Sequence, residues 1–470
     1  MNMKAIPKAA PTPLPELETY LQPFIKLFRR SWSRQSCERY ITGLLTDLPH
    51  KNCETIAGAL AGTSTERLQH LLTDADWDAL ALHQLRVQHL LSFSPKDGLL
   101  ALDDTSLLKQ GRESVGVARQ YSGVKGKPAN CQAVVTAEYS VEEPSTKSIL
   151  HWPVCAQLYL PESWIADSKR RERAHVPGDV PAQTKQEIAL QLIDQALQWH
   201  VPFNVIVADA GYGRNAGFLK GLEERKLRYV CGVECTFGVR RPEEVALAQQ
   251  LPPPPRTGKN GRPRKAHPAP LYTVQEIIAK LPDEQWQTIT WREGSRGPMR
   301  KQFVAVRMHW AMGTAARTLQ DRRVYTGAAG WLIGERPLPG QEGECKYYFS
   351  NLPATKSLQQ LVPLVRGRWP IEQFYEEAKQ ECGLDDYQGR RWDGLHRHLA
   401  LVMLAYSFLM CERMRTEQDP AGSPDSCHPK RPPLPAIHRN ILLWLLQDLV
   451  LWWIATDHVK TFRSPRAGPG

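Results

Sequence analysis

Two short apolar runs in this chain each end in aspartate. Gly98–Leu102 leads directly into Asp103 and Asp104, and Val205–Ala208 leads into Asp209. A short apolar run between polar residues is typical of a buried strand, and ligands bind at the rim of such a sheet. Both runs therefore predict carboxylates at a sheet edge, where they can hold a metal ion. The alternative for the first run is a turn opened by its two aspartates.

A third acid comes from a predicted helix further along the chain. Pro370 suits the first turn of this helix and Gly383 suits its end. Arg368, Glu372 and Lys379 are spaced by four and by seven residues, so their side chains project from roughly one side. Glu372 then completes a triad of acids, while Arg368 and Lys379 contact phosphates. A surface ladder of ion pairs is the alternative interpretation.

Positive charge is concentrated next to the first acid. The chain has a formal net charge of +11, with 60 Lys and Arg against 49 Asp and Glu, which favours a polyanionic partner. The glycine-rich stretch from Lys109 to Gln132 is expected to be a flexible loop. In it, Arg119, Lys125 and Lys127 would contact a phosphate backbone and Tyr121 would stack. A solvated loop without a ligand is the alternative.

The pattern of elements predicts the α/β fold class. Three strands, a helix, a strand, a helix and a strand follow Gly98, so the first and fourth strands can lie side by side and bring Asp103 next to Asp209. Five segments are expected, namely a helical N-terminal domain that is a candidate for DNA binding (1–95), the first part of a catalytic core (96–235), an inserted β-rich subdomain with a basic Pro-rich linker (236–351), the final part of the core (352–415), and a Pro-rich segment with a C-terminal helix (416–470).

Three further stretches have two interpretations each. Asn52–Leu72 has two short helical runs broken by a glycine, which predicts either a helix-turn-helix or part of a plain helical bundle. The basic segment Gly261–Lys265 is either a hook for the minor groove of DNA or a linker. Tryptophans of the insertion are expected mainly in its core, although at least one is expected to stack on a displaced base. They are Trp286, Trp291, Trp310 and Trp331.

Several motifs, taken together, resemble one family. They are LDDTSLLKQG, GVARQYSGVKGKPANCQ, LYLPESW, VPFNVIVADAGYG and RWPIEQFYEEAKQECGLDDYQGRRWDGLHRH. The chain from about Tyr20 to Met410 resembles bacterial insertion-sequence transposases of the DDE superfamily, and more narrowly the group with a Tyr-Arg-Glu-Lys signature. Arg368, Glu372 and Lys379 match the last three residues of that signature. Val365 stands where the signature has its tyrosine, so a DNA-hairpin step at the strand ends that depends on that tyrosine is in doubt.

The resemblance implies both a fold and a reaction. The fold is an RNase H-like core, interrupted by a β insertion before the last catalytic helix. The reaction is the cutting and joining of transposon ends, with Asp103, Asp209 and Glu372 as catalytic residues and as ligands of two Mg²⁺ ions, for which Mn²⁺ is expected to substitute. Asp104 competes with Asp103 for the first position. Two such ions stabilise the attacking and leaving oxygens of phosphodiester transfer, and Mg²⁺ prefers carboxylate oxygens.

The same resemblance implies partners and a location. The partner is double-stranded DNA, as transposon ends and as target, bound by a homodimer in the bacterial cytoplasm at the nucleoid. Scattered cysteines without a CxxC pair agree with a reducing compartment, and no apolar run is long enough to predict a membrane span. Two alternatives stay open, namely a transposase-derived DNA-binding regulator without catalysis and a hydrolytic nuclease with the same core.

Overall fold

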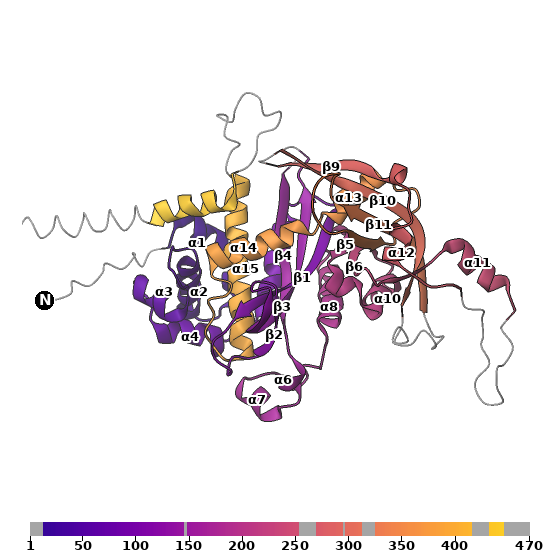
Figure 1. Cartoon of the computed structure of the whole chain (residues 1–470). Helices are drawn as coiled ribbons and strands as arrows, with labels where there is room; N and C mark the ends of the chain where they lie inside the picture. The colour runs from indigo at the N-terminus through magenta and orange to yellow at the C-terminus, as the bar shows by residue number, and fades with distance from the viewer. Residues whose placement is uncertain are drawn as a thin grey trace, which may run out of the picture.

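The computed structural model describes residues 13–144, 148–252, 269–294, 297–312, 325–415 and 432–445. Three parts follow one another in space, which are a helical layer, a central sheet with helices on both faces, and an extension of that sheet (Figure 1). The basic segment Gly261–Lys265 lies outside the described residues. The predicted C-terminal helix is described as helical over 434–445, and its remainder also lies outside them.

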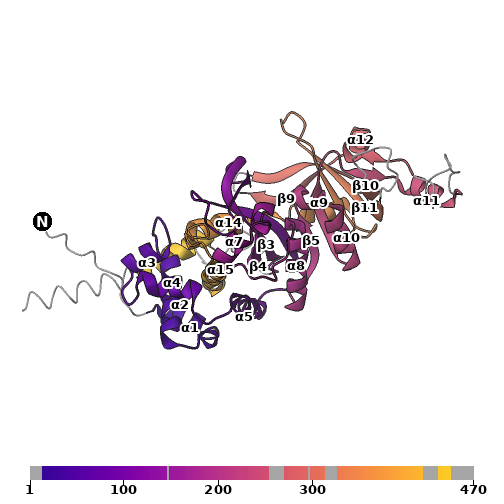
Figure 2. The ribbon, with the colours of Figure 1, turned by 90° about the horizontal axis from the view of Figure 1, so that it is seen from below.

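The helical layer confirms the prediction for the N-terminal region. Its elements are α1 (Pro15–Leu21), η1 (Ile25–Leu27), α2 (Ser31–Leu44), α3 (Cys53–Ala59), α4 (Thr65–Thr73) and α5 (Ala79–Leu91). Helices α2, α4 and α5 pack around α15 (Trp392–Arg415), a long helix from the far end of the described core. Figure 2 shows these helices at the end of the molecule opposite α11.

The two interpretations of Asn52–Leu72 can be compared with this packing. Asn52 caps α3 in a capping box, and Ser64 caps α4 by accepting a hydrogen bond from the Arg67 amide. Helix α4 buries Leu68 and Leu71 and packs against α2, α3 and α15. This packing supports the helical bundle. Contact of α3 and α4 with DNA stays a prediction.

The central sheet has the predicted neighbours. Its strands are β1 (Gly98–Leu108), β2 (Ala118–Ser122), β3 (Lys127–Glu142), β4 (Ile149–Tyr159), β5 (Phe203–Ala208) and β6 (Arg228–Val233). Strands β1, β3 and β4 pair antiparallel, while β5 is parallel to β1 and β6 is parallel to β5. The order β4-β3-β1-β5-β6 confirms that the first and fourth predicted strands are adjacent.

Helices cover both faces of this sheet. Between and after these strands, the core has the helices α6 (Glu162–Ile165), α7 (Ser168–Arg173), α8 (Lys185–Gln198), α9 (Ala210–Gly213), α10 (Ala216–Glu224), α13 (Leu358–Val365), α14 (Trp369–Cys382) and α15. Helices α14 and α15 lie on one face, and α8 and α10 lie on the other (Figure 1). Helix α8 begins after a capping box at Thr184 and buries Ile188, Leu192 and Ile193, as its periodicity predicts.

The predicted insertion continues the same sheet. Its elements are β7 (Gly238–Arg240), α11 (Pro242–Gln250), β8 (Tyr272–Thr273), α12 (Val274–Ile278), η2 (Asp283–Gln285), β9 (Gln287–Gly294), β10 (Gly297–Met312), β11 (Tyr325–Arg336) and β12 (Lys346–Ser350). Strand β12 pairs with β6, and β11 and β10 follow. Pairing with β12 covers an edge that would otherwise expose unpaired backbone groups of β6.

Helix α15 is long and apolar enough to cross a membrane, the one such helix among the described residues. However, 89% of its apolar window is buried inside the protein, where it forms the axis of the helical layer. Its length and hydropathy are therefore those of a core helix. Tyr406, for example, is fully buried on α15, and its hydroxyl donates to Glu377 of α14.

Candidate active site

The first two acids follow the last paired residues of two adjacent parallel strands. Parallel pairing between β1 and β5 ends at Leu102 opposite Ala208, so Asp103 and Asp209 are the next residues on neighbouring strands. Asp209 caps α9, and its Oδ1 accepts hydrogen bonds from the amides of Gly211 (2.9 Å) and Tyr212 (3.3 Å). The expectation that Asp103 ends its strand is wrong, because β1 continues to Leu108 along β3.

The two neighbouring aspartates face different partners. Side chains of successive strand residues point to opposite faces of a sheet. Asp103 accepts a hydrogen bond from Arg368 on the face covered by α14. Asp104 accepts one from Lys185 Nζ of α8 at 2.6 Å, and the Tyr212 hydroxyl lies 3.5 Å from its other oxygen. Only Asp103 therefore shares a face with the predicted third acid.

Helix α14 brings the third acid to the first. The helix ends at Gly383, whose φ of 65° is left-handed, as predicted. Arg368 stands at its N-cap and donates to both Asp103 and Glu372. Burial opposes the charge of Arg368, yet the carboxylates of Asp103, Glu372 and Asp209 raise the pKa of its guanidinium. The guanidinium therefore lies in the field of all three predicted acids.

Two further side chains of α14 reach β1 beyond the acids. Lys379 Nζ donates to Thr105 Oγ1 at 2.8 Å, and burial lowers the pKa of this lysine. The Tyr375 hydroxyl donates to the backbone oxygen of Asp103 at 3.0 Å. Lys379 therefore lies on the same face as Arg368, which agrees with the helical spacing, while Tyr375 fixes the backbone at Asp103.

The donor set fits a divalent cation. Burial, followed by the neighbouring charges of Asp209 and Asp104, raises the pKa of Asp103 to about 7, although Arg368 opposes this shift. Three carboxyl groups, those of Asp103, Asp209 and Glu372, act on the one guanidinium of Arg368, and carboxylate oxygens are the ligands that Mg²⁺ prefers. Among the described residues no three acids are close enough to hold one ion, because Arg368 separates Asp103 from Glu372. The Glu372 side chain is 51% exposed, so it can turn toward Asp103.

From Ala118 onward the basic stretch beside the first acid is a hairpin, so the expectation of a flexible loop is wrong there, while residues 109–117 join β1 to it without helix or strand. Strand β2 pairs with β3 from Ala118 opposite Cys131 to Ser122 opposite Lys127. Four predicted DNA-binding residues are exposed on the hairpin: Arg119 and Tyr121 alternate onto one face of β2, Lys125 lies in the turn, and Lys127 is paired with Ser122 on the other face. Arg368 and Lys379 are separate from them, because both contact β1 at the acids.

The tryptophans of the insertion lie mainly in its core, as predicted, and stacking by one of them on a base stays a prediction. Trp310 is fully buried and donates to Glu223 at 2.6 Å, and Trp286 is 9% exposed beneath Arg336. Trp291 and Trp331 are partly buried against arginines. The sequence-based interpretation missed a residue nearer the acids, since Trp369 follows Arg368 directly and is 43% exposed. Its position directly after Arg368 in the sequence could have identified it as a candidate for stacking.

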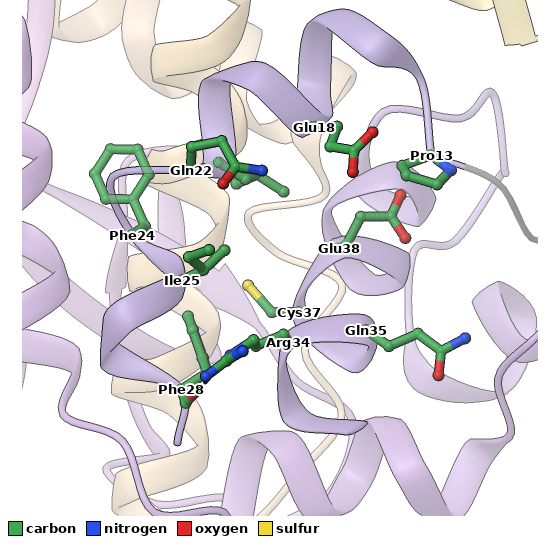
Figure 3. Close-up of a pocket in the computed structure, with 11 residues that line it drawn as sticks. Pro13, Glu18, Gln22, Phe24, Ile25, Phe28, Arg34, Gln35, Cys37 and Glu38 are labelled. Atoms are coloured by element: carbon green, nitrogen blue, oxygen red, sulfur yellow. Dashed lines mark hydrogen bonds between the residues drawn. The ribbon is translucent and has the colours of Figure 1, made fainter. Parts of the chain in front are cut away.

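The clearest pocket lies elsewhere. It has a volume of about 270 Å³ between α1, η1 and α2, and apolar side chains including Phe24, Ile25 and Phe28 line it (Figure 3). None of those elements carries Asp103, Asp209 or Glu372. The candidate site is therefore where Asp103, Asp209 and Glu372 gather around Arg368, rather than this apolar pocket.

Comparison with known proteins identifies the family. Residues 23–298, more than half of the chain, match the family described as DDE superfamily endonuclease. The chain belongs to this superfamily. Asp103 and Asp209 fall within the matched stretch of the DDE domain, and Glu372 lies beyond it. The mixed α/β core with its β4-β3-β1-β5-β6 order is accordingly the RNase H-like fold of this superfamily.

One relative has a more specific name. The DDE chain is 30% identical over 227 residues to the probable transposase for insertion sequence element IS701 of Microchaete diplosiphon. The match covers 48% of this chain and 55% of the relative. The chain thus spans about half the length of the relative that it matches.

Proposed function

We propose that this DDE protein is a DNA transposase, which cleaves transposon ends and joins them to target DNA. The observation that carries the proposal is the placement of Asp103 and Asp209 at the end of one parallel strand pair, with Glu372 linked to Asp103 through Arg368. Membership of the DDE superfamily and the name of the relative support the same activity.

In this proposal Asp103, Asp209 and Glu372 hold two Mg²⁺ ions, and Mn²⁺ substitutes. The bound ions would supply the charge neutralisation and the activated water that phosphodiester transfer requires. Asp209 is held in place by the two amides at the start of α9. Arg368 and Lys379 bind phosphate oxygens on either side of the acids. Because Arg368 is already bonded to two carboxylates, it can exchange one of them for a phosphate without leaving the site.

The DNA partner is double-stranded, and its phosphates contact the β2–β3 hairpin through Arg119, Lys125 and Lys127. Tyr121 is 66% exposed on the same hairpin and is available for stacking. A homodimer in the DNA complex and a cytoplasmic location at the nucleoid complete the proposal. Both follow from the role of a transposase.

Incubation of the protein with DNA containing its element's ends and Mg²⁺, followed by sequencing of the products, tests the function. A transposase yields cut ends with free 3′-OH groups and strand-transfer products. A hydrolytic nuclease yields cut ends alone, and a DNA-binding regulator yields neither. Omission of the metal or its replacement by Ca²⁺, which demands different coordination, is the control for metal dependence.

Affinity for DNA is expected to fall steeply with salt. Lys125 and Lys127 are exposed on the hairpin, and neither forms an ion pair with another described residue. Each phosphate contact releases counterions and contributes about 0.9 to the slope of log K against log salt concentration. Replacing either lysine with Ala should therefore reduce that slope by about this amount. The measurement is DNA binding by fluorescence anisotropy over a salt series. A slope unchanged in both variants would contradict hairpin contact.

Trp369 is expected to take the stacking role first assigned to the insertion. It is the exposed tryptophan nearest to Arg368, and Arg292 covers part of its ring at 4.4 Å from the centroid. Stacking on a displaced base contributes roughly 1–3 kcal/mol. Trp369→Ala should slow end cleavage by a factor consistent with that energy while the midpoint of thermal unfolding stays close to that of the wild type. Trp369→Phe should retain most activity, and equal losses in both variants would argue against stacking.

A further inference from the structure

Glu335 is a fully buried carboxylate in the sheet extension. It lies on β11, and its side chain is 0% exposed. Lys301 Nζ donates to its Oε1 at 2.7 Å and the Tyr348 hydroxyl donates to its Oε2 at 2.9 Å. Burial acts to raise the pKa of Glu335, but the hydrogen bond from Lys301 and the charges of Arg366 and Lys301 outweigh it and lower the pKa. The carboxylate is therefore held ionised inside the protein.

The third partner of this carboxylate is Arg366, which lies outside the extension. Its Nη2 is 2.5 Å from Glu335 Oε1, close enough for an ion pair although the angle is not that of a hydrogen bond. Its guanidinium also stacks on Trp291 of β9, 4.5 Å from the ring centroid. Arg366 caps the C-terminal end of α13, and its backbone oxygen accepts from the Trp369 amide at 3.3 Å.

Arg366, Gly367 and Arg368 form the corner between α13 and α14. This corner has little room to move, because a Cβ added at Gly367 would overlap the Leu99 side chain of β1. The residue after Arg368 is Trp369, and the guanidinium of Arg292 from β9 lies over its ring. Strand β9 thus contacts the corner both before and after Arg368.

We infer that Glu335 is a positioning residue for the proposed reaction: by anchoring Arg366, it fixes the corner from which Arg368 reaches Asp103 and Glu372. The inference rests on the proposed function. It gives the sheet extension a role in assembling the site, since the extension supplies Glu335, Lys301 and Trp291. Breaking a buried ion pair by removing one charge leaves the other uncompensated, so the arginine would leave its place and the corner would follow.

Glu335→Gln is the direct test, because the amide keeps the shape of the carboxylate and removes its charge. A small misplacement of a binding group can cost about 100-fold in rate. We expect a loss of that order in single-turnover cleavage at saturating DNA, with affinity for DNA unchanged. Tyr348→Phe is the milder variant, which keeps the carboxylate, and we expect a several-fold loss by the same reasoning.

A structural readout separates this inference from the proposed function. Hydrogen exchange of the amides in 366–372 should become faster in Glu335→Gln, whether or not the protein cleaves DNA. Asp283→Asn is the matched control, because it breaks the exposed ion pair of the adjacent residue Arg336. This control should leave both exchange at the corner and cleavage unchanged.

A double-mutant cycle tests the route through Arg368. If Glu335 acts by positioning that arginine, Glu335→Gln should have little effect on cleavage in an Arg368→Ala background. Two results would overturn the inference. One is an equal loss of cleavage in both backgrounds, and the other is hydrogen exchange at the corner of Glu335→Gln that matches the wild type. A wild-type protein that cleaves no DNA while the variant still loosens the corner would instead contradict the proposed function and leave the positioning intact.

Discussion

Asp103→Asn, Asp209→Asn and Glu372→Gln are each expected to lower DNA cleavage by roughly 10⁴-fold, the size of loss that removal of an essential group reaches in other enzymes. Each change removes a negative charge that the proposed function assigns to metal binding, but keeps the shape of the side chain. Specific DNA binding should stay largely intact, since the cations proposed to contact DNA on the hairpin are unchanged. The measurements are single-turnover cleavage and DNA affinity on the same preparations.

Asp104→Asn is the matched control for the first acid. Asp104 is bonded to Lys185 on the opposite face of β1, away from Arg368 and Glu372. The loss of one partly exposed ion pair is expected to cost at most about 1 kcal/mol of stability and little activity. An inactive Asp104→Asn protein beside an active Asp103→Asn protein would reverse the assignment of the first acid.

Gly213→Ala is expected to destabilise the protein and to impair cleavage at the same time. Gly213 ends α9, the turn that follows Asp209, and it packs against the backbone of β6. A Cβ there would overlap the carbonyl oxygen of Gly232 and lie 2.9 Å from the Cβ of Cys231. Because a strand backbone cannot turn aside as a flexible side chain can, α9 must move and carry Asp209 with it. Overpacking of this kind typically costs 1–3 kcal/mol, and we expect about 3 kcal/mol here.

Urea denaturation and cleavage measured on the same variant test this prediction. Gly58→Ala is the control, since Gly58 lies inside α3 with nothing within 4 Å of the added Cβ. Alanine is a better helix former than glycine, so this variant should gain about 0.5–1 kcal/mol. A Gly213→Ala protein with normal stability and normal cleavage would show that α9 can shift without displacing Asp209.

The local elements could be predicted because their signals are local. Strand β5 contains the apolar run Val205–Ala208 that predicted it, and α8 and α14 begin and end next to the residues that cap them. Apolar periodicity and capping chemistry involve residues within one or two turns, so they survive without knowledge of the rest of the chain. The same applies to the alignment of Arg368, Glu372 and Lys379, which helical spacing alone determines.

Other features depend on which distant segment becomes the neighbour. Part of the basic stretch after β1 forms a strand because it pairs with the edge of β3. Strand β1 extends beyond its parallel pairing with β5 because β3 continues beside it. The sheet extension was expected to be β-rich, but its continuity with β6 comes from pairing across more than 100 residues of sequence. No local pattern encodes such a pairing.

The sequence by itself identified three candidate acids. It also predicted the helix that carries one of them and the strands that precede the other two. Only the tertiary structure showed which of Asp103 and Asp104 faces α14, because alternation along a strand fixes that their faces differ but not which face α14 will cover. The tertiary structure likewise determines that Glu335 is buried against Arg366. A carboxylate among apolar strand residues has no intrinsic partner, and the ion pair exists only because folding brings β11 to the corner between α13 and α14.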